Sequence, residues 1–522
     1  MKGRLTARAA MALALGSILL FVGFAFARTW YLDRIGVSYG KAPAVLDERT
    51  RELFTQLTGE PAPEFEVHWY TLENKFLPAG VGGNDGAPAI GFQTLLRHTR
   101  IAAQAFAPAG GFVSVFDPMP SAGTAHVVLD AGGKLVSWTH WPTSMGKAAP
   151  GTEVDWSRLF ALAGLDMQSA VAIDPEFVPR TNAIERRAWK VGDGPWRVQG
   201  AALDGRAVQF EVLDGERSVG WPPAPTGDGS AWVFLGLTAI AAVVAWRNLR
   251  QKRAYLSGAL VVGGFALATH LVLAFDGVIP TDPQGFGTSL FHVLAISAGT
   301  ALRVFLFFLA LEPFARRHWP GALISWTRLL EGRFQDPAVG REVLVGVFSG
   351  LCATLAILLV GAALAALGLQ PWVAGPLLGI TGISSPLQTL FHVFHFWGDT
   401  VMFGGIFLAL LVATRTLVRR AWLGNVIWLA LTLLLFSGWM LEDPATIAAM
   451  LGVLAGYLFL LTRFGFMAVL VFMGVLGTLT FQGLTLRPGD WYFASGLINL
   501  LVFGLLVAWG YRASMTGRAA GA

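Results

Sequence analysis

Five residues whose side chains can bind metals or carry protons fall within apolar segments of this sequence. They are His270, His292, His392, His395 and Asp399. Ionisable residues inside a membrane segment are costly, and by default they indicate a functional site. His392, His395 and Asp399 are spaced i, i+3 and i+7 and therefore share one helical face, while His270 ends one apolar segment and His292 begins the next. All five could converge near one membrane surface.

Imidazole and carboxylate ligands suit Zn, Fe or Cu, and two histidines on different helices could bind the iron of a haem. A chain of His and Asp side chains could instead relay protons. The alternative is that these histidines have no catalytic or binding role and simply contact lipid headgroups and water near the membrane edge. A metal or haem is therefore a candidate cofactor, and the catalytic residues, if any, are unknown.

A superficial resemblance to the CPBP-type intramembrane proteases rests on Glu312-x-x-x-Arg316, Phe391-x-x-x-His395 and His395-x-x-x-Asp399. The first motif of that family has paired glutamates, whereas Leu311 precedes Glu312 in this chain. The predicted topology also separates Glu312 from His395 by on the order of 25 Å in membrane depth. One metal ion cannot bind both, so the sequence argues against this enzyme class.

The elements that position these residues are predicted to be membrane helices. The chain has 522 residues, of which 54% are hydrophobic and only 14% charged, against about 25% charged in soluble domains. A bilayer core needs about 20 apolar residues in a helix. Ten segments qualify, and Gly346-x-x-x-Gly350 in one of them is a small-residue packing motif. The segments are 9–27, 231–246, 254–275, 287–311, 343–367, 391–414, 422–441, 445–462, 464–481 and 493–511.

Basic residues predict the orientation of these segments. Outside residues 28–229 the chain has 20 Lys and Arg, and 18 of them fall in one alternating set of connections, against Arg487 alone in the other set. The positive-inside rule then predicts cytoplasmic N- and C-termini and an extracytoplasmic segment 28–229 in a bacterial inner membrane. Because topology accounts for the basic excess, no nucleic-acid partner is expected. Ala25-Phe26-Ala27 could be a signal-peptide cleavage site, but the long apolar run favours an uncleaved anchor.

The predicted fold class is an α-helical polytopic membrane protein of about 10 spans with an inserted α+β extracytoplasmic domain. Its parts are the anchor 1–27, the α+β domain 28–229 and the multi-span domain 230–522 with a basic cytoplasmic loop, 312–342. Within the α+β domain the patterns predict helices at 44–58, 92–106 and 155–165, the last capped by Asp155. Strands are expected at 65–70, 112–116 and 125–129, and hairpins at 129–138 and at 196–213, the latter turning at Asp204-Gly205.

The loop 312–342 is basic and amphipathic. It would lie on anionic headgroups or form a docking surface for a protein partner. The residues that would make this interaction are Glu312, Arg316, Arg317, Trp319, Trp326, Arg328, Arg333, Asp336 and Arg341.

This loop resembles a segment in the membrane-embedded C-terminal region of certain bacterial Ser/Thr protein kinases. The match rests on Leu311-Glu312-Pro313, Arg316-Arg317, Trp319-Pro320, Trp326 to Leu330, Gly332-Arg333, Asp336-Pro337 and Val339 to Arg341, with a similar stretch at Asp155-Trp156-Ser157. The resemblance implies a sensory region. The Gly-rich phosphate loop, the H-R-D and the D-F-G of a kinase are missing, so this chain is not expected to be a kinase.

The sequence favours a non-catalytic sensor or scaffold, in contact with the lipid bilayer, that binds a ligand or partner through the extracytoplasmic domain. The alternatives are a membrane enzyme or redox protein that uses the histidine cluster, and a transporter.

Overall fold

The computed structural model divides the chain into two compact units. One comprises residues 1–30, 227–276 and 293–522, and the other comprises 31–226 and 277–292. The structure describes residues 5–34, 39–62, 65–72, 90–97, 123–142, 153–192, 196–214, 230–276, 283–367, 385–418, 420–435 and 444–516. The first unit is helical and is called here the bundle. The second contains a separate antiparallel sheet and is called here the sheet domain.

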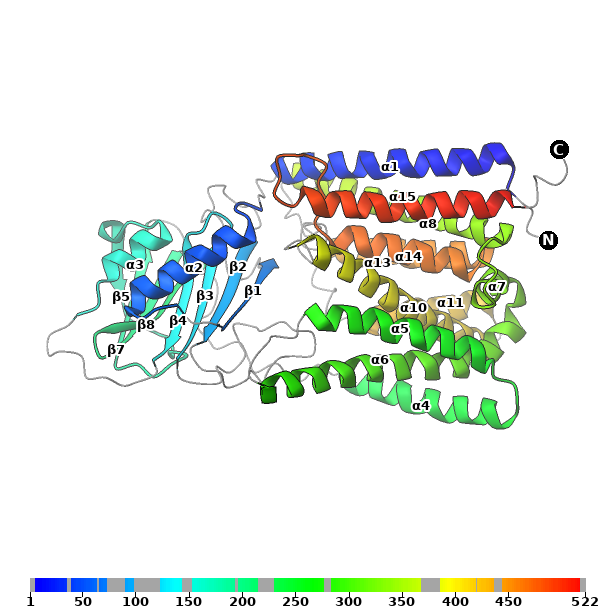
Figure 1. Ribbon diagram of the computed structural model, residues 1–522, viewed down its shortest axis with the longest axis horizontal. Helices are drawn as coiled ribbons and strands as arrows, with labels where there is room; N and C mark the ends of the chain where they lie inside the picture. Colours follow the sequence, from blue (N-terminus) through cyan, green and yellow to red (C-terminus); the bar gives the residue numbers. More distant parts are fainter. Residues whose placement is uncertain are drawn as a thin grey trace. The chain divides into compact units, whose positions relative to one another are not determined.

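The bundle consists of helices that run roughly parallel or antiparallel to one another (Figure 1). Each of the ten predicted apolar segments overlaps a helix, and five helices are long and apolar enough to cross a membrane. The structure thus confirms a mostly helical chain with membrane helices, while the total of about 10 spans stays a prediction. The helices are α1 (Ala7–Arg34), α4 (Ser230–Arg250), α5 (Leu256–Asp276), α6 (Pro283–His318), α7 (Ile324–Leu330), α8 (Pro337–Ala366), α10 (Pro386–Leu417), α11 (Ala421–Leu435), α13 (Pro444–Arg463), α14 (Phe466–Phe481) and α15 (Phe493–Met515).

Small residues set a close helix contact between α8 and α14. A Cβ atom at Gly346 of α8 would lie 2.6 Å from the Cβ of Val471 of α14, and one at Gly350 would lie 2.7 Å from the Cβ of Val475. No side chain fits at either glycine, so the two backbones approach closely. The predicted small-residue motif is therefore a packing motif in this structure.

The sheet domain contains an eight-stranded antiparallel sheet with the order β1-β2-β3-β4-β8-β7-β6-β5 (Figure 1). Its strands are β1 (Phe65–Leu72), β2 (Ile90–Arg97), β3 (Thr124–Asp130), β4 (Leu135–Trp141), β5 (Ala170–Ile173), β6 (Glu185–Val191), β7 (Trp196–Leu203) and β8 (Arg206–Asp214). Two helices pack on it, α2 (Pro43–Thr58) and α3 (Trp156–Ala163).

Both helices cover the same face of the sheet. Phe54 of α2 packs on Trp138 of β4, with ring centroids 6.1 Å apart, and Phe160 of α3 packs on Phe210 of β8 at 5.9 Å. Trp138 and Phe210 are cross-strand partners and therefore point to one side. These four fully buried aromatic side chains form the core of the domain.

Most local predictions in the sheet domain are confirmed. α2 matches 44–58, β1 and β3 match their predicted strands, and the two hairpins are β3–β4 and β7–β8. Asp204 and Gly205 both have positive φ, as a two-residue hairpin turn requires, and the Asp155 side chain accepts a hydrogen bond from the N–H of Arg158 as the cap of α3. The predicted helix 92–106 is wrong over its first part, because 90–97 form β2. The predicted strand 112–116 lies outside the described residues.

A buried histidine makes the sheet domain sensitive to acid. His126 of β3 is 1% exposed. Burial, reinforced by the positive charge of Arg180, lowers the pKa of His126 to about 3 from its ordinary 6.5. Between these two values the unfolded chain binds this proton and the folded chain does not. The free energy of unfolding therefore falls as the pH drops from 6.5 toward 3.

We expect this loss of stability to be roughly 1.4 kcal/mol per pH unit within that window. His126→Gln removes the titrating group and should flatten the dependence. Urea unfolding of the full chain in detergent, followed at pH 7 and pH 5, measures the difference. His318→Gln, at an exposed histidine of the bundle, is the control. Equal pH dependence in wild type and His126→Gln would contradict this account.

Candidate metal site

A close contact between α5 and α10 creates the site. Gly398 of α10 faces Thr269 of α5, and a Cβ atom at Gly398 would lie 2.2 Å from the Thr269 hydroxyl oxygen. The same atom would lie 3.4 Å from Cε1 of His270. Because Gly398 has no side chain, His270 comes within reach of the residues that flank Gly398 on α10.

Three of the predicted ligands meet at this contact. The Nε2 atom of His270 lies 3.4 Å from Oδ1 of Asp399, and Nε2 of His395 lies 3.2 Å from Oδ2 of the same carboxylate. The two imidazole rings are 4.9 Å apart and nearly perpendicular. One ligand atom from each residue lies within 4.8 Å of the other two. Around a tetrahedral zinc ion with bonds of about 2.0–2.1 Å, neighbouring ligand atoms are about 3.3 Å apart. Both imidazole–carboxylate distances are close to this value, with each imidazole facing a different oxygen of Asp399.

The hydrogen bonds of His270 leave its Nε2 atom for a metal ion or a proton. Its Nδ1 lies 2.9 Å from the carbonyl oxygen of Ala266, so Nδ1 carries the hydrogen and donates it. In a neutral ring Nε2 then presents a lone pair to the Asp399 carboxylate, which is also an acceptor. Two acceptors at this distance repel each other unless a metal ion or a second proton lies between them. A carbonyl that orients the far nitrogen of a histidine is the usual support of a metal ligand.

The other two predicted ligands, His392 and His292, are not part of the three-residue group that the structure describes. His392 lies one turn before His395 on α10, is 9% exposed, and its Nδ1 contacts the carbonyl oxygen of Gln388 at 2.9 Å. His392 is close enough to His395 to act on it electrostatically, but it does not belong to the three-residue group. His292 lies in α6, and its side chain falls outside the described part of the chain.

The geometry favours a single metal ion over haem. A haem takes its two axial histidines on opposite faces of a flat macrocycle. His270 and His395 instead approach one carboxylate from neighbouring helices. The side chains of His270, His395 and Asp399 are 10%, 23% and 26% exposed, so the group is partly accessible. Three protein ligands leave a fourth position of a tetrahedral ion open for water or substrate.

Sequence reasoning did not identify Gly398 and Thr269, which set the distance between the two helices. A glycine one residue before Asp399 was the available signal, since glycine inside a helix often marks a close approach.

The loop 312–342 lies largely against the bundle. Trp326 of α7 is 8% exposed and packs on Phe466 of α14 with ring centroids 5.7 Å apart. Arg328 binds both carboxylate oxygens of Asp336 at 3.0 and 2.9 Å, and Arg341 is 7% exposed and lies 3.3 Å from the Glu342 carboxylate. These three side chains therefore stabilise the conformation of segment 312–342.

The remaining loop residues lie closer to the surface or at a pocket. Arg316 and Arg317 are exposed, Arg333 pairs with Glu331 at 3.3 Å, and the Trp319 ring stacks under Arg415 at 4.5 Å. Glu312 is 7% exposed, binds Arg316 and is not part of the metal group. The exposed basic side chains are the ones that remain accessible to headgroups or to a partner.

No protein-family model, curated protein or solved structure matches this chain. The resemblance to the membrane region of bacterial kinases therefore stays a prediction.

We expect Gly398→Ala to separate α5 from α10 and to lower stability by about 1–3 kcal/mol through overpacking. The control is Gly405→Ala on the same helix, because a Cβ atom at Gly405 meets no neighbour within 4 Å. Thermal unfolding of the full chain in detergent measures both variants. Equal melting temperatures for the two would show that the contact is not tight.

Proposed function

We propose that this chain is an integral membrane metalloprotein that binds one divalent transition-metal ion, zinc by its donor set, through His270, His395 and Asp399. The observation that carries the proposal is that Nε2 of His270 lies 3.4 Å from Oδ1 of Asp399 while its Nδ1 lies 2.9 Å from the Ala266 carbonyl oxygen, so that a neutral ring turns a lone pair toward the carboxylate. A metal ion would turn that repulsion into two bonds. The imidazole and carboxylate ligands suit zinc, and the open fourth position is typical of a site that binds water or substrate.

We further propose the topology that places this site in the membrane. The ten apolar helices would cross a bacterial inner membrane with cytoplasmic N- and C-termini, and the sheet domain would be extracytoplasmic. Five helices that are long and apolar enough to span support this arrangement, as does the alternation of basic residues. The metal site would then lie toward the extracytoplasmic end of α5, which ends soon after His270.

A sensor or scaffold is the second candidate, and the surface of the sheet domain supports it. Val171 on the edge strand β5 is 66% exposed, and Val178 and Ile184 are 68% and 78% exposed. Exposed apolar side chains at a sheet edge suit the binding of a partner. This function would agree with the resemblance to a kinase sensory region. A transporter has less support, because the pocket found among the described residues is mostly apolar.

Metal analysis of the full chain tests the proposal. The detergent-purified protein is stripped with a chelator, dialysed against zinc and assayed for bound metal, with cobalt substitution to report a tetrahedral site by its visible absorption. We expect one zinc ion per chain. Asp399→Asn and His395→Ala should weaken zinc binding by more than about 100-fold, since even supporting residues change affinity by 10–100-fold.

The control variant is His318→Ala, which removes an exposed histidine outside the site. A folded wild-type chain that binds no stoichiometric zinc would overturn the proposal and leave the sensor or scaffold as the favoured function. A haem band in the visible spectrum that disappears in His395→Ala would also overturn it, in favour of a redox protein.

A further inference from the structure

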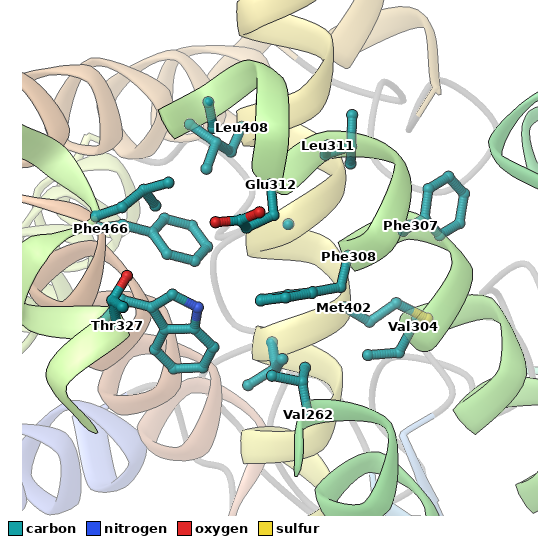
Figure 2. A pocket seen from close by; sticks show the side chains of 15 residues that line it. Val262, Val304, Phe307, Phe308, Leu311, Glu312, Thr327, Met402, Leu408 and Phe466 are labelled. Atoms are coloured by element: carbon teal, nitrogen blue, oxygen red, sulfur yellow. The ribbon is translucent and has the colours of Figure 1, made fainter. Parts of the chain in front are cut away.

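A mostly apolar pocket lies within the bundle, between α5, α6, α7, α10 and α14. Its walls include Phe307 and Phe308 of α6, Trp326 of α7, Met402 of α10 and Phe466 of α14. The cavity has a volume of about 50 Å³. Figure 2 shows the side chains that line it. One water molecule needs roughly 10–15 Å³ by a comparable measure, so there is room for part of a small organic molecule.

One carboxylate lies in this apolar wall (Figure 2). Glu312 is 7% exposed, and its Oε1 accepts hydrogen bonds from Nε of Arg316 at 2.6 Å and from Nη2 of the same guanidinium. Its other oxygen, Oε2, is buried and has no hydrogen-bond partner among the described residues. A buried acceptor without a donor is costly. A ligand that brings one donor would remove that cost.

The charges around Glu312 select the kind of donor. Arg316 already balances the carboxylate, and its side chain is 55% exposed, so it remains hydrated. An ammonium group would add an unbalanced positive charge to an apolar pocket. A neutral hydroxyl would instead donate a charge-assisted hydrogen bond to Oε2 without changing the net charge.

The aromatic side chains that line the pocket favour a ligand whose hydroxyl is attached to an aromatic ring. Phe307, Phe308, Trp326 and Phe466 line the pocket, and aromatic rings pack favourably on other rings in offset or edge-to-face contacts. We propose that this pocket binds a membrane-soluble phenol, an aromatic ring with one hydroxyl and an apolar tail, with the hydroxyl donating to Oε2 of Glu312.

This pocket is separate from the metal site. Its lining includes none of the three metal ligands, although Val401 of α10 lies two residues after Asp399. On α5, Val262 of the lining lies eight residues before His270, or about 12 Å along the helix. Phenol binding therefore does not depend on zinc, and Asp399→Asn should bind the phenol as the wild type does.

Equilibrium dialysis of the full chain in detergent with 4-hexylphenol tests the proposal. The matched probe 4-hexylanisole has a methyl ether in place of the hydroxyl, and hexylammonium carries a charged donor. We expect saturable binding of one phenol per chain and about tenfold weaker binding of the anisole, which corresponds to one lost hydrogen bond. Glu312→Gln should weaken phenol binding about tenfold and leave anisole binding unchanged.

A variant whose new side chain fills the pocket tests whether the probes bind there. Gly405 lines the pocket and a Cβ atom there meets open space, so Gly405→Leu should fold and exclude both aromatic probes. Gly264→Leu, at an exposed glycine of α5 whose Cβ would also meet nothing, is the control. Equal affinity for phenol and anisole in the wild type, unchanged binding in Gly405→Leu, or tighter binding of hexylammonium would each overturn the proposal.

Discussion

The absence of side chains at a few glycines is the constraint on which the bundle depends. In a membrane, lipid tails are as apolar as leucine, so helices associate through close packing and polar contacts more than through the hydrophobic effect. Gly346 and Gly350 bring α8 against α14, and Gly398 brings α5 against α10. The first contact forms part of the core, and the second sets the distances in the metal site. The packing of the bundle and the geometry of the metal site thus both depend on glycines at helix contacts.

Polar side chains of the bundle mostly bind backbone carbonyls of their own helix, and a few bind those of a neighbouring helix. Nδ2 of Asn248 on α4 donates to Leu309 and Ala310 of α6, and the Trp428 indole N–H donates to Phe407 of α10. Such bonds satisfy polar groups where water is scarce. The carboxylates of Asp399 and Glu312 are acceptors instead. Each oxygen of Asp399 faces an imidazole nitrogen, and Oε2 of Glu312 has no hydrogen-bond partner among the described residues. The first arrangement is the reason for the metal proposal, and the second is the reason for the phenol proposal.

The sheet domain obtains its stability in a different way. Its strands are joined largely as antiparallel neighbours, and two helices cover one face through aromatic contacts. His126 lies fully buried in β3, an interior strand of the sheet, so the domain keeps one of its few ionisable core groups neutral. The bundle carries the candidate chemistry, whereas the sheet domain offers a folded surface with exposed apolar residues at one edge.

The sequence by itself determined what depends on local pattern. Long apolar runs marked the ten long bundle helices but not α7, Asp204-Gly205 marked a hairpin turn, and Asp155 marked a helix cap. The spacing of His395 and Asp399 placed them on one helical face. It did not determine that 90–97 form a strand, because a short apolar run fits a helix or a strand until β1 and β3 pair with it. Only the tertiary structure decided that His270 joins His395 and Asp399, that α7 folds back onto α14, and that Glu312 has a free oxygen in a pocket. These features depend on distances between helices, which are set by contacts among residues far apart in the chain.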